Sequence, residues 1–97
     1  MQVKLSFWVS PSPNVDRYRV KYGNAEDNMN QTVDFSAVGM TSSPSQVTVT
    51  DLDATKPWYF SIVALNPFDL ESAPSNIVNT AVAPDPPTNL AVAAMLA

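Results

Sequence analysis

The sequence contains no cysteine and no histidine, and both absences narrow what the chain can do. Without cysteine there is no disulfide framework and no thiolate metal site. Without either residue the chain lacks the usual nucleophile, general base and soft metal ligand of enzymes, so that only Asp, Glu, Lys or Ser would remain for catalysis. We therefore expect a protein that is not an enzyme, with no catalytic residue, no metal ion and no cofactor.

Basic residues and long apolar runs are scarce as well. Lys and Arg number 5 against 9 Asp and Glu, which gives a net charge of -4, and no basic cluster is accompanied by aromatic residues. We therefore expect no nucleic-acid partner. No stretch approaches the ~20 apolar residues of a membrane span, and the first residues lack the apolar run of a signal peptide. These features predict no membrane insertion, and no signal peptide is visible in this chain.

What the sequence does contain is a set of short apolar runs, and their pattern predicts an all-β domain. The 97 residues allow one domain with a single core. The runs are rich in β-branched and aromatic residues and are bounded by turn residues, and the 9 prolines are too densely scattered for long helices.

Six strands are predicted, separated by turn signals at the spacing typical of a β-sandwich. They cover residues 1–9, 17–23, 31–40, 46–52, 58–65 and 76–82. In the second strand, Tyr18, Val20 and Tyr22 alternate with Arg17, Arg19 and Lys21, as in a half-buried antiparallel strand. The candidates for inward-facing positions in the next two strands are Val33, Phe35, Val38, Val47, Val49 and Leu52.

The first strand leaves two arrangements open. Leu5 and Phe7 share one parity and Trp8 has the other, so a regular strand cannot turn all three toward the core. Either Phe7 fills the core position and Trp8 is exposed, or a bulge switches the strand from one face to the other between them.

Three segments of the chain resemble the fibronectin type III family, and together they span most of residues 2–83: LSFW, DRYRVKYG and VTVTDLDATKPWYFSIVALNPFDLESAPSN. The residues that fall on the family's pattern around strand F are Leu52, Trp58, Ile62, Ala64 and Asn66. The resemblance implies an immunoglobulin-like β-sandwich of fibronectin type III topology. Trp58 stands where the family has a corner tyrosine, so an indole N–H would have to replace the hydroxyl in any bond to upstream backbone.

The resemblance also implies that residues 1–83 supply strands B to G, and that the domain's own strand A is absent at the N-terminal end. A segment similar to strand A stands at the other end, as PPTNLAV from Pro86 to Val92. In this sandwich G ends roughly 25–35 Å from where A must begin, whereas a four-residue connector such as Pro84–Pro87 reaches about 14 Å. We therefore expect residues 84–97 to be a proline-rich connector and a tail that does not complete its own domain.

Three fates of this tail are open. A tail cut from a tandem array would hang disordered. A tail given to another copy would add a strand beside strand B and join copies head-to-tail, and a third possibility is a strand given to a different protein. The alternation of apolar residues after the proline pair suits one buried face, and the candidate assembly strand consists of Pro86, Leu90, Val92, Ala94 and Leu96.

The turn of residues 66–75 is a second candidate, because loops at the ends of a sandwich often carry recognition. Its candidate contact residues are Phe68, Asp69, Leu70 and Glu71. Phe68 and Leu70 either form a small exposed apolar patch or pack over the end of the core. The acidic pairs Asp51 with Asp53 and Glu26 with Asp27 lack the alternating carboxylates of a calcium loop, and we interpret them as solvated turns.

These expectations combine into a structural and adhesive module whose partners are proteins, above all other copies of itself arranged head-to-tail. Such a module would belong to an extracellular filament or to a virion surface. The alternative is a spacer or accessory-binding module cut from a large secreted enzyme or adhesin, in which the neighbouring domains are covalently attached.

Overall fold

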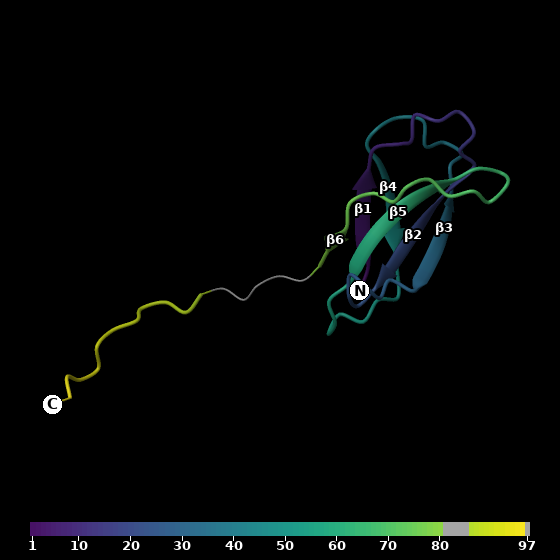
Figure 1. Cartoon of the computed structure of the whole chain (residues 1–97). Coiled ribbons are helices and arrows are strands. Elements are labelled where there is room, and N and C mark those ends of the chain that lie inside the picture. Colours follow the sequence, from purple (N-terminus) through teal and green to yellow (C-terminus); the bar gives the residue numbers. More distant parts are fainter. Residues whose placement is uncertain (81–85, 97) are drawn as a thin grey trace.

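The computed structural model of the chain describes residues 1–80 and 86–96 (Figure 1). These residues form strands and no helix, which confirms the all-β prediction. The strands are β1 (Val3–Phe7), β2 (Arg17–Gly23), β3 (Gln31–Ser36), β4 (Ser45–Val49), β5 (Tyr59–Leu65) and β6 (Val78–Asn79). Each predicted strand overlaps one of them, but the last is only 2 residues long. Its predicted extension through Ala81 and Val82, and the predicted domain boundary between residues 83 and 84, lie outside the described residues.

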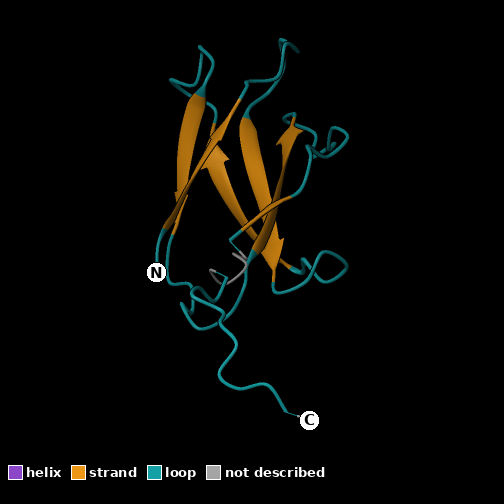
Figure 2. Ribbon diagram, turned by 90° about the vertical axis from the view of Figure 1, so that its left-hand side faces the viewer, coloured by secondary structure: helices purple, strands orange, loops and turns teal. Residues whose placement is uncertain are grey.

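The strands form two antiparallel sheets that face each other (Figure 2). One sheet contains β1 and β4, and the other has the order β3-β2-β5-β6. In the larger sheet Val20 lies opposite Val33 on one side and Ile62 on the other, so β2 is one of its two inner strands, together with β5. The smaller sheet therefore has to cover a sheet with twice as many strands.

The turns gather at the two ends of the sandwich. The upper end, as drawn in Figure 1, carries residues 8–16, 37–44 and 66–77. Two hydrogen bonds tie the first of these turns down: Val9 N–H donates to Ser43 Oγ, and Ser10 N–H donates to the Tyr18 hydroxyl, both at 2.9 Å. The lower end carries the N-terminus, and β6 runs toward it.

One apolar core fills the space between the sheets. Its buried residues are Val20, Val47, Val49, Leu52, Trp58 and Phe60. The alternation predicted for β2 is confirmed, because Tyr18 and Val20 are buried while Arg17, Arg19 and Lys21 lie on the outer face. The residues of β1 that face this core, Val3, Leu5 and Phe7, are only half-buried.

The structure decides between the two arrangements of the first strand. Phe7 packs against the core, and its ring centroid lies 4.9 Å from that of Tyr18. Trp8 follows the end of β1 and is 76% exposed. The strand is regular from Val3 to Phe7, so no bulge is needed to explain the parity.

One inward assignment is wrong. Val38 is 90% exposed because β3 ends at Ser36 and the chain then turns. Met40 N–H donates to Ala37 O at 3.0 Å, and Gly39 adopts a left-handed backbone with φ 85°, which a side chain would disfavour. The strand therefore stops before its alternation reaches Val38.

The indole N–H of Trp58 makes a hydrogen bond to upstream backbone, which the sequence had left undecided. Its indole Nε1–H donates to the carbonyl oxygen of Asp53 at 2.9 Å, while the ring is buried beside Tyr22. The donor satisfies a carbonyl at the turn before β5 and holds that turn against the core. An indole therefore connects the start of β5 to upstream backbone without a hydroxyl.

We predict that Trp58→Phe lowers the free energy of unfolding by about 1–3 kcal/mol, because it removes the indole donor and part of the buried ring. Trp8→Phe is the matched control and should change it by less than about 0.5 kcal/mol, since Trp8 is exposed. The measurement is urea denaturation followed by circular dichroism. Equal effects of the two substitutions would contradict the role assigned to the Trp58 corner.

Candidate functional site

The first candidate site is a groove along the open edge of β1. Within the described part of the chain, β1 pairs with β4 alone, so its other edge has no strand beside it. A hollow of about 430 Å³ lies there, between β1 on one side and β5 with the segment before β6 on the other. Its lining consists of Leu5, Ser6, Phe7, Trp8, Phe60, Ser61, Ile62, Ser75, Asn76 and Val78.

The edge of β5 that faces the segment before β6 is bonded through serine and threonine hydroxyls, of which that of Ser75 belongs to a residue that lines the groove. Ala64 N–H donates to Ser72 Oγ at 2.9 Å, and Ile62 N–H donates to Ser75 Oγ at 3.0 Å. Trp58 N–H likewise donates to Thr80 Oγ1 at 3.0 Å. Backbone N–H groups of the same three hydroxyl residues donate in return to the carbonyls of Ala64, Ile62 and Trp58.

This pairing satisfies β5 without a regular neighbouring strand. The Ser72 and Ser75 hydroxyls each pass a hydrogen bond on to the carbonyl of the following residue, Ala73 or Asn76. The backbone carbonyls of the two serines are thus not the acceptors that a sheet ladder would use. On this edge of β5 regular pairing is limited to β6, and Ser75 and Asn76 of the irregular segment before β6 line the groove.

The candidate assembly strand lies apart from this groove. Residues 86–96 form no strand (Figure 1), and every one of them is exposed. Pro86, Leu90, Val92, Ala94 and Leu96 therefore make no packed face within their own domain.

Groove and tail share one electrostatic property, which is that neither contains a charged side chain. The residues that line the groove are apolar or are neutral Ser and Asn. Residues 86–96, PPTNLAVAAML, contain no Asp, Glu, Lys or Arg. The two surfaces would therefore meet without burying a charge, which is the costliest event at an interface.

The second candidate site is the loop at residues 66–71, and local hydrogen bonds give it a fixed shape. Asn66 Oδ1 accepts from the N–H groups of Phe68 and Leu70, at 2.9 and 3.0 Å. Asp69 has a left-handed backbone with φ 62°, and its N–H donates to Asn66 O at 3.1 Å. The loop turns Phe68 and Leu70 outward, 82% and 66% exposed. Of the two arrangements left open by the sequence, the exposed patch is the one observed.

The acidic residues of this loop are bound to the outer face of β2. Asp69 pairs with Arg17, and the two oxygens of Glu71 accept from Arg19 Nη1 at 3.1 Å and Lys21 Nζ at 2.8 Å. Asp34 on β3 joins the same array, because Arg19 Nε donates to its Oδ1 at 2.7 Å. Two of the four candidate contact residues, Asp69 and Glu71, thus pair with cations of β2, and the Asp69 side chain stays 76% exposed.

The ion pairs shift the acidity of these carboxylates. Hydrogen bonding from Arg19 is the main cause that lowers the pKa of Asp34 below its ordinary value, and hydrogen bonding from Lys21 does the same to the pKa of Glu71. Both groups therefore remain ionised throughout the neutral and weakly acidic range.

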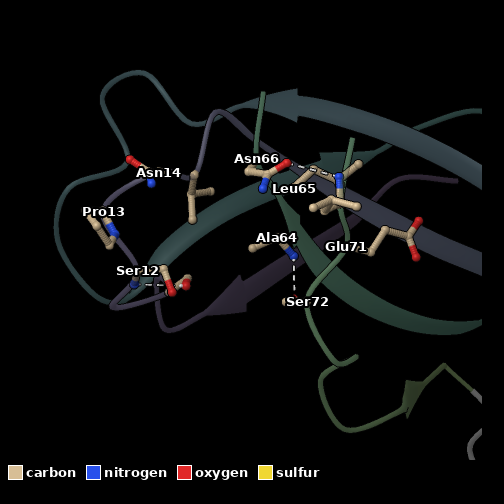
Figure 3. Close-up of a pocket in the computed structure, with 11 residues that line it drawn as sticks. Ser12, Pro13, Asn14, Ala64, Leu65, Asn66, Glu71 and Ser72 are labelled. Atoms are coloured by element: carbon tan, nitrogen blue, oxygen red, sulfur yellow. Dashed lines mark hydrogen bonds between the residues drawn. The ribbon is translucent and has the colours of Figure 1, made fainter. Parts of the chain in front are cut away.

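A second hollow, of about 380 Å³, lies at the upper end and is shown in Figure 3. Ser12, Pro13 and Asn14 lie on one side of it, and Ala64, Asn66 and Ser72 lie on the other. Among the described residues that line it, the ionisable one is Glu71, which is already paired with Lys21 and Arg19. A carboxylate with a lowered pKa in two ion pairs is a poor proton carrier near neutral pH.

Among the other acidic residues that the structure describes, Glu26, Asp27, Asp51 and Asp53 lie at exposed turns. Asp53 accepts from the N–H and hydroxyl of Thr55, at 2.9 and 2.6 Å, and the hydroxyl bond is the main cause that lowers its pKa. Among residues 1–80 and 86–96, no cluster of three or more Asp, Glu, His or Cys is arranged to hold a metal ion. No helix in the described part of the chain is long and apolar enough to cross a membrane.

Sequence reasoning missed three features of these surfaces. It did not find the position of Trp8 at the groove, although the odd parity of Trp8 was the available signal. It also missed the hydroxyl pairing of Ser72, Ser75 and Thr80, for which the sequence carries no periodic signal. The ion pairs of the loop were missed too, because they join residues about fifty positions apart, as in Arg19 and Glu71 (|i−j| of 52).

Comparison with known proteins adds no relative of this chain. No protein-family model matches it, and no curated protein matches it significantly in sequence. Its function is therefore inferred from the groove, the loop and the tail.

We predict that acid releases the loop. Because the folded-state pKa values of Asp34 and Glu71 are lowered, their stabilisation is present at neutral pH and is lost as the pH falls below their ordinary values of 3.8 and 4.5. The double variant Asp34→Asn, Glu71→Gln should therefore show a smaller fall in melting temperature between pH 7 and pH 3 than the parent chain.

The matched control is Asp27→Asn, Glu26→Gln, which removes the same two types of acid from an exposed turn without ion pairs among the described residues. This control should retain the pH dependence of the parent. If both double variants follow the parent between pH 7 and pH 3, the array on β2 does not brace the loop.

Proposed function

We propose that this chain is a non-enzymatic structural module that joins copies of itself head-to-tail, each giving residues 86–96 to the open edge of β1 in the next copy. The observation that carries the proposal is the pairing of two incomplete surfaces in one chain. One is an uncharged groove beside an unpaired strand, and the other is an exposed, uncharged tail with alternating apolar residues.

The order of the strands supports a sandwich of fibronectin type III type. In that topology β1 and β4 would correspond to strands B and E, and β3, β2, β5 and β6 to strands C′, C, F and G. Among the described strands none corresponds to strand A, which would lie beside β1, where the groove lies. The indole bond of Trp58 to Asp53 is a counterpart of the corner bond made by a tyrosine hydroxyl in related sandwiches.

The energetics of an open β1 favour a donated strand. Its inward residues, Val3, Leu5 and Phe7, remain half-buried, so part of the core is in contact with water. An unpaired strand edge also exposes backbone donors and acceptors that natural proteins usually cover. Burying the four alternating side chains of the tail would contribute about 5 kcal/mol before the costs of ordering and association are subtracted.

The path of the chain favours donation to another copy. β6 runs toward the lower end, whereas a strand antiparallel to β1 begins at the upper end. To pair with its own β1, the chain after β6 would first have to return from the lower end, at the level of Trp58, to the upper end, at the level of Ala64. This distance is about 20 Å at ~3.3 Å per residue, and the chain would have to cover it before its alternating residues could pair. A strand from a second copy can approach the upper end directly.

The geometry of such a contact determines the kind of assembly. Donor and acceptor surfaces differ, so the contact is heterologous and leaves one free tail and one free groove at the ends of every chain of copies. An arrangement of this kind grows into a filament or links neighbours within a shell. An extracellular filament and a virion surface are the settings that this assembly would suit.

We predict that the mass measured by light scattering rises with protein concentration, and that Leu90→Asp, Val92→Asp weakens association by at least about tenfold, because two charges would enter an apolar groove. The matched control is Ala91→Asp, Ala93→Asp, which adds the same charge on the opposite face of the tail. This control should still assemble, and a chain ending at Ala83 should not.

Well-folded monomers of equal stability in all four proteins would contradict the proposal. The tail would then be the first strand of a covalently attached neighbour, as in the spacer alternative. A monomeric parent whose stability falls on Leu90→Asp, Val92→Asp would instead reveal insertion of the tail into its own groove, which also contradicts donation between copies.

A further inference from the structure

Trp8 is the one large aromatic side chain of the sandwich that projects into water beside the groove. It follows Phe7, which already fills the core position against Tyr18. At 76% exposure its indole does little for the core, yet it lines the groove together with Ser75 and Asn76. An exposed tryptophan at the rim of an apolar groove is a common anchor of protein contacts.

Its position at the end of β1 means that antiparallel and parallel tails would bring different residues to it. Trp8 lies at the upper end, immediately past the last residue of the strand. A donated strand antiparallel to β1 arrives at this end with its own N-terminal residues, whereas a parallel strand would bring its C-terminal residues here. The contacts of Trp8 therefore differ between a tail that binds antiparallel to β1 and one that binds parallel to it.

The residues that an antiparallel tail would bring to Trp8 are Pro86 and Pro87. Both are exposed, and they precede the first alternating residue, Leu90. Asn89, which stands between the proline pair and Leu90, has a left-handed backbone with φ 57°. The chain therefore bends between the proline pair and the alternating segment. Proline rings pack well on aromatic faces, and their fixed φ reduces the entropy lost on binding.

Matching the inward residues on both strands gives a register. With Leu90 beside Phe7, Val92 falls beside Leu5 and Ala94 beside Val3, so that every inward residue of β1 gains an apolar partner. In this register Asn89 lies opposite Trp8, and the bend after the proline pair brings Pro86 and Pro87 to the rim where the indole projects. A parallel tail would carry the prolines to the Met1 end, away from any exposed tryptophan.

We propose that Trp8 of the acceptor copy is the docking residue for Pro86 and Pro87 of the donor, and that this contact sets the direction and register of the donated strand. This inference rests on the proposed function and goes beyond it, because strand donation could occur with no role for Trp8. It assigns to an exposed indole and a proline pair the task that turn geometry performs when two strands belong to one hairpin.

Association strength and emission test the contact first. Trp8→Ala and Pro86→Ala, Pro87→Ala should each weaken association by roughly 2–10-fold, since aromatic packing contributes modestly beyond buried area. Trp8→Phe retains an aromatic face and should stay within about twofold, and Val38→Ala, which alters an exposed residue of the same end that does not line the groove, should have no effect. Trp8 emission should shift to shorter wavelength as copies associate, while Trp58 is buried throughout.

Engineered disulfides then report direction and register, and the absence of native cysteine makes them unambiguous. One chain carries Ser6→Cys or Lys4→Cys on β1, and a second chain carries Ala91→Cys or Ala93→Cys in the tail. Directly opposite positions lie close enough for a disulfide. The proposed register predicts rapid cross-links for Ser6 with Ala91 and for Lys4 with Ala93. The swapped pairs are Ser6 with Ala93 and Lys4 with Ala91. When the chain with the β1 cysteine also carries Trp8→Ala, these swapped pairs should form cross-links as well.

The outcomes separate the two proposals. If no pair of chains cross-links with Trp8 intact, strand donation itself fails and this inference fails with it. If Trp8→Ala leaves both the expected cross-links and the strength of association unchanged, strand donation stands and the role of Trp8 is overturned. If the swapped pairs dominate in the parent, the tail runs in another direction or register, which also overturns the proposal.

Discussion

The constraint on which the rest of this structure depends is that a two-stranded sheet has to close a four-stranded one. Adjacent strands are ~4.8 Å apart, so the larger sheet is about 14 Å wide between its outer strands and the smaller is about 5 Å wide. The strip that remains uncovered lies beside β1, and it is the groove. The half-burial of Val3, Leu5 and Phe7 follows from the same mismatch, because their outer flank faces that strip.

The larger sheet has adapted to this strip on its own side. A regular sixth strand would present a straight edge of backbone groups to the groove, which is a template for unspecific pairing. Instead, the hydroxyls of Ser72 and Ser75 satisfy β5, and the chain around them stays irregular. On the outer face, Arg17, Arg19 and Lys21 hold the loop that enters this segment through Asp69 and Glu71. Within residues 1–80 and 86–96, the regular strand edge that stays free at the groove is therefore that of β1, and this edge is the one that a donated strand would pair with.

The fold was largely predictable from sequence because its signals are local. Alternation placed Val20, Val47 and Val49 on inward faces, and the observed burial of each follows that parity. The inward assignment of Val38 was wrong because a turn at Gly39 ends β3 early. Alternation over two residues cannot show whether the strand continues or turns. The candidate surfaces were only half predictable. The tail has a periodic pattern, but the groove exists only through the meeting of β1, β5 and the residues before β6, which no local pattern encodes.

Charge explains why an apolar strand is the contact that this chain can use. Each copy carries a net charge of -4, so copies repel one another at long range. The cations on β2 are already neutralised within the domain by Asp34, Asp69 and Glu71, and they are not free to attract an acidic neighbour. The groove and residues 86–96 are uncharged. An association that has to overcome repulsion without complementary charges depends on apolar burial and backbone pairing, and these are the two things that an unpaired β1 and an alternating tail supply.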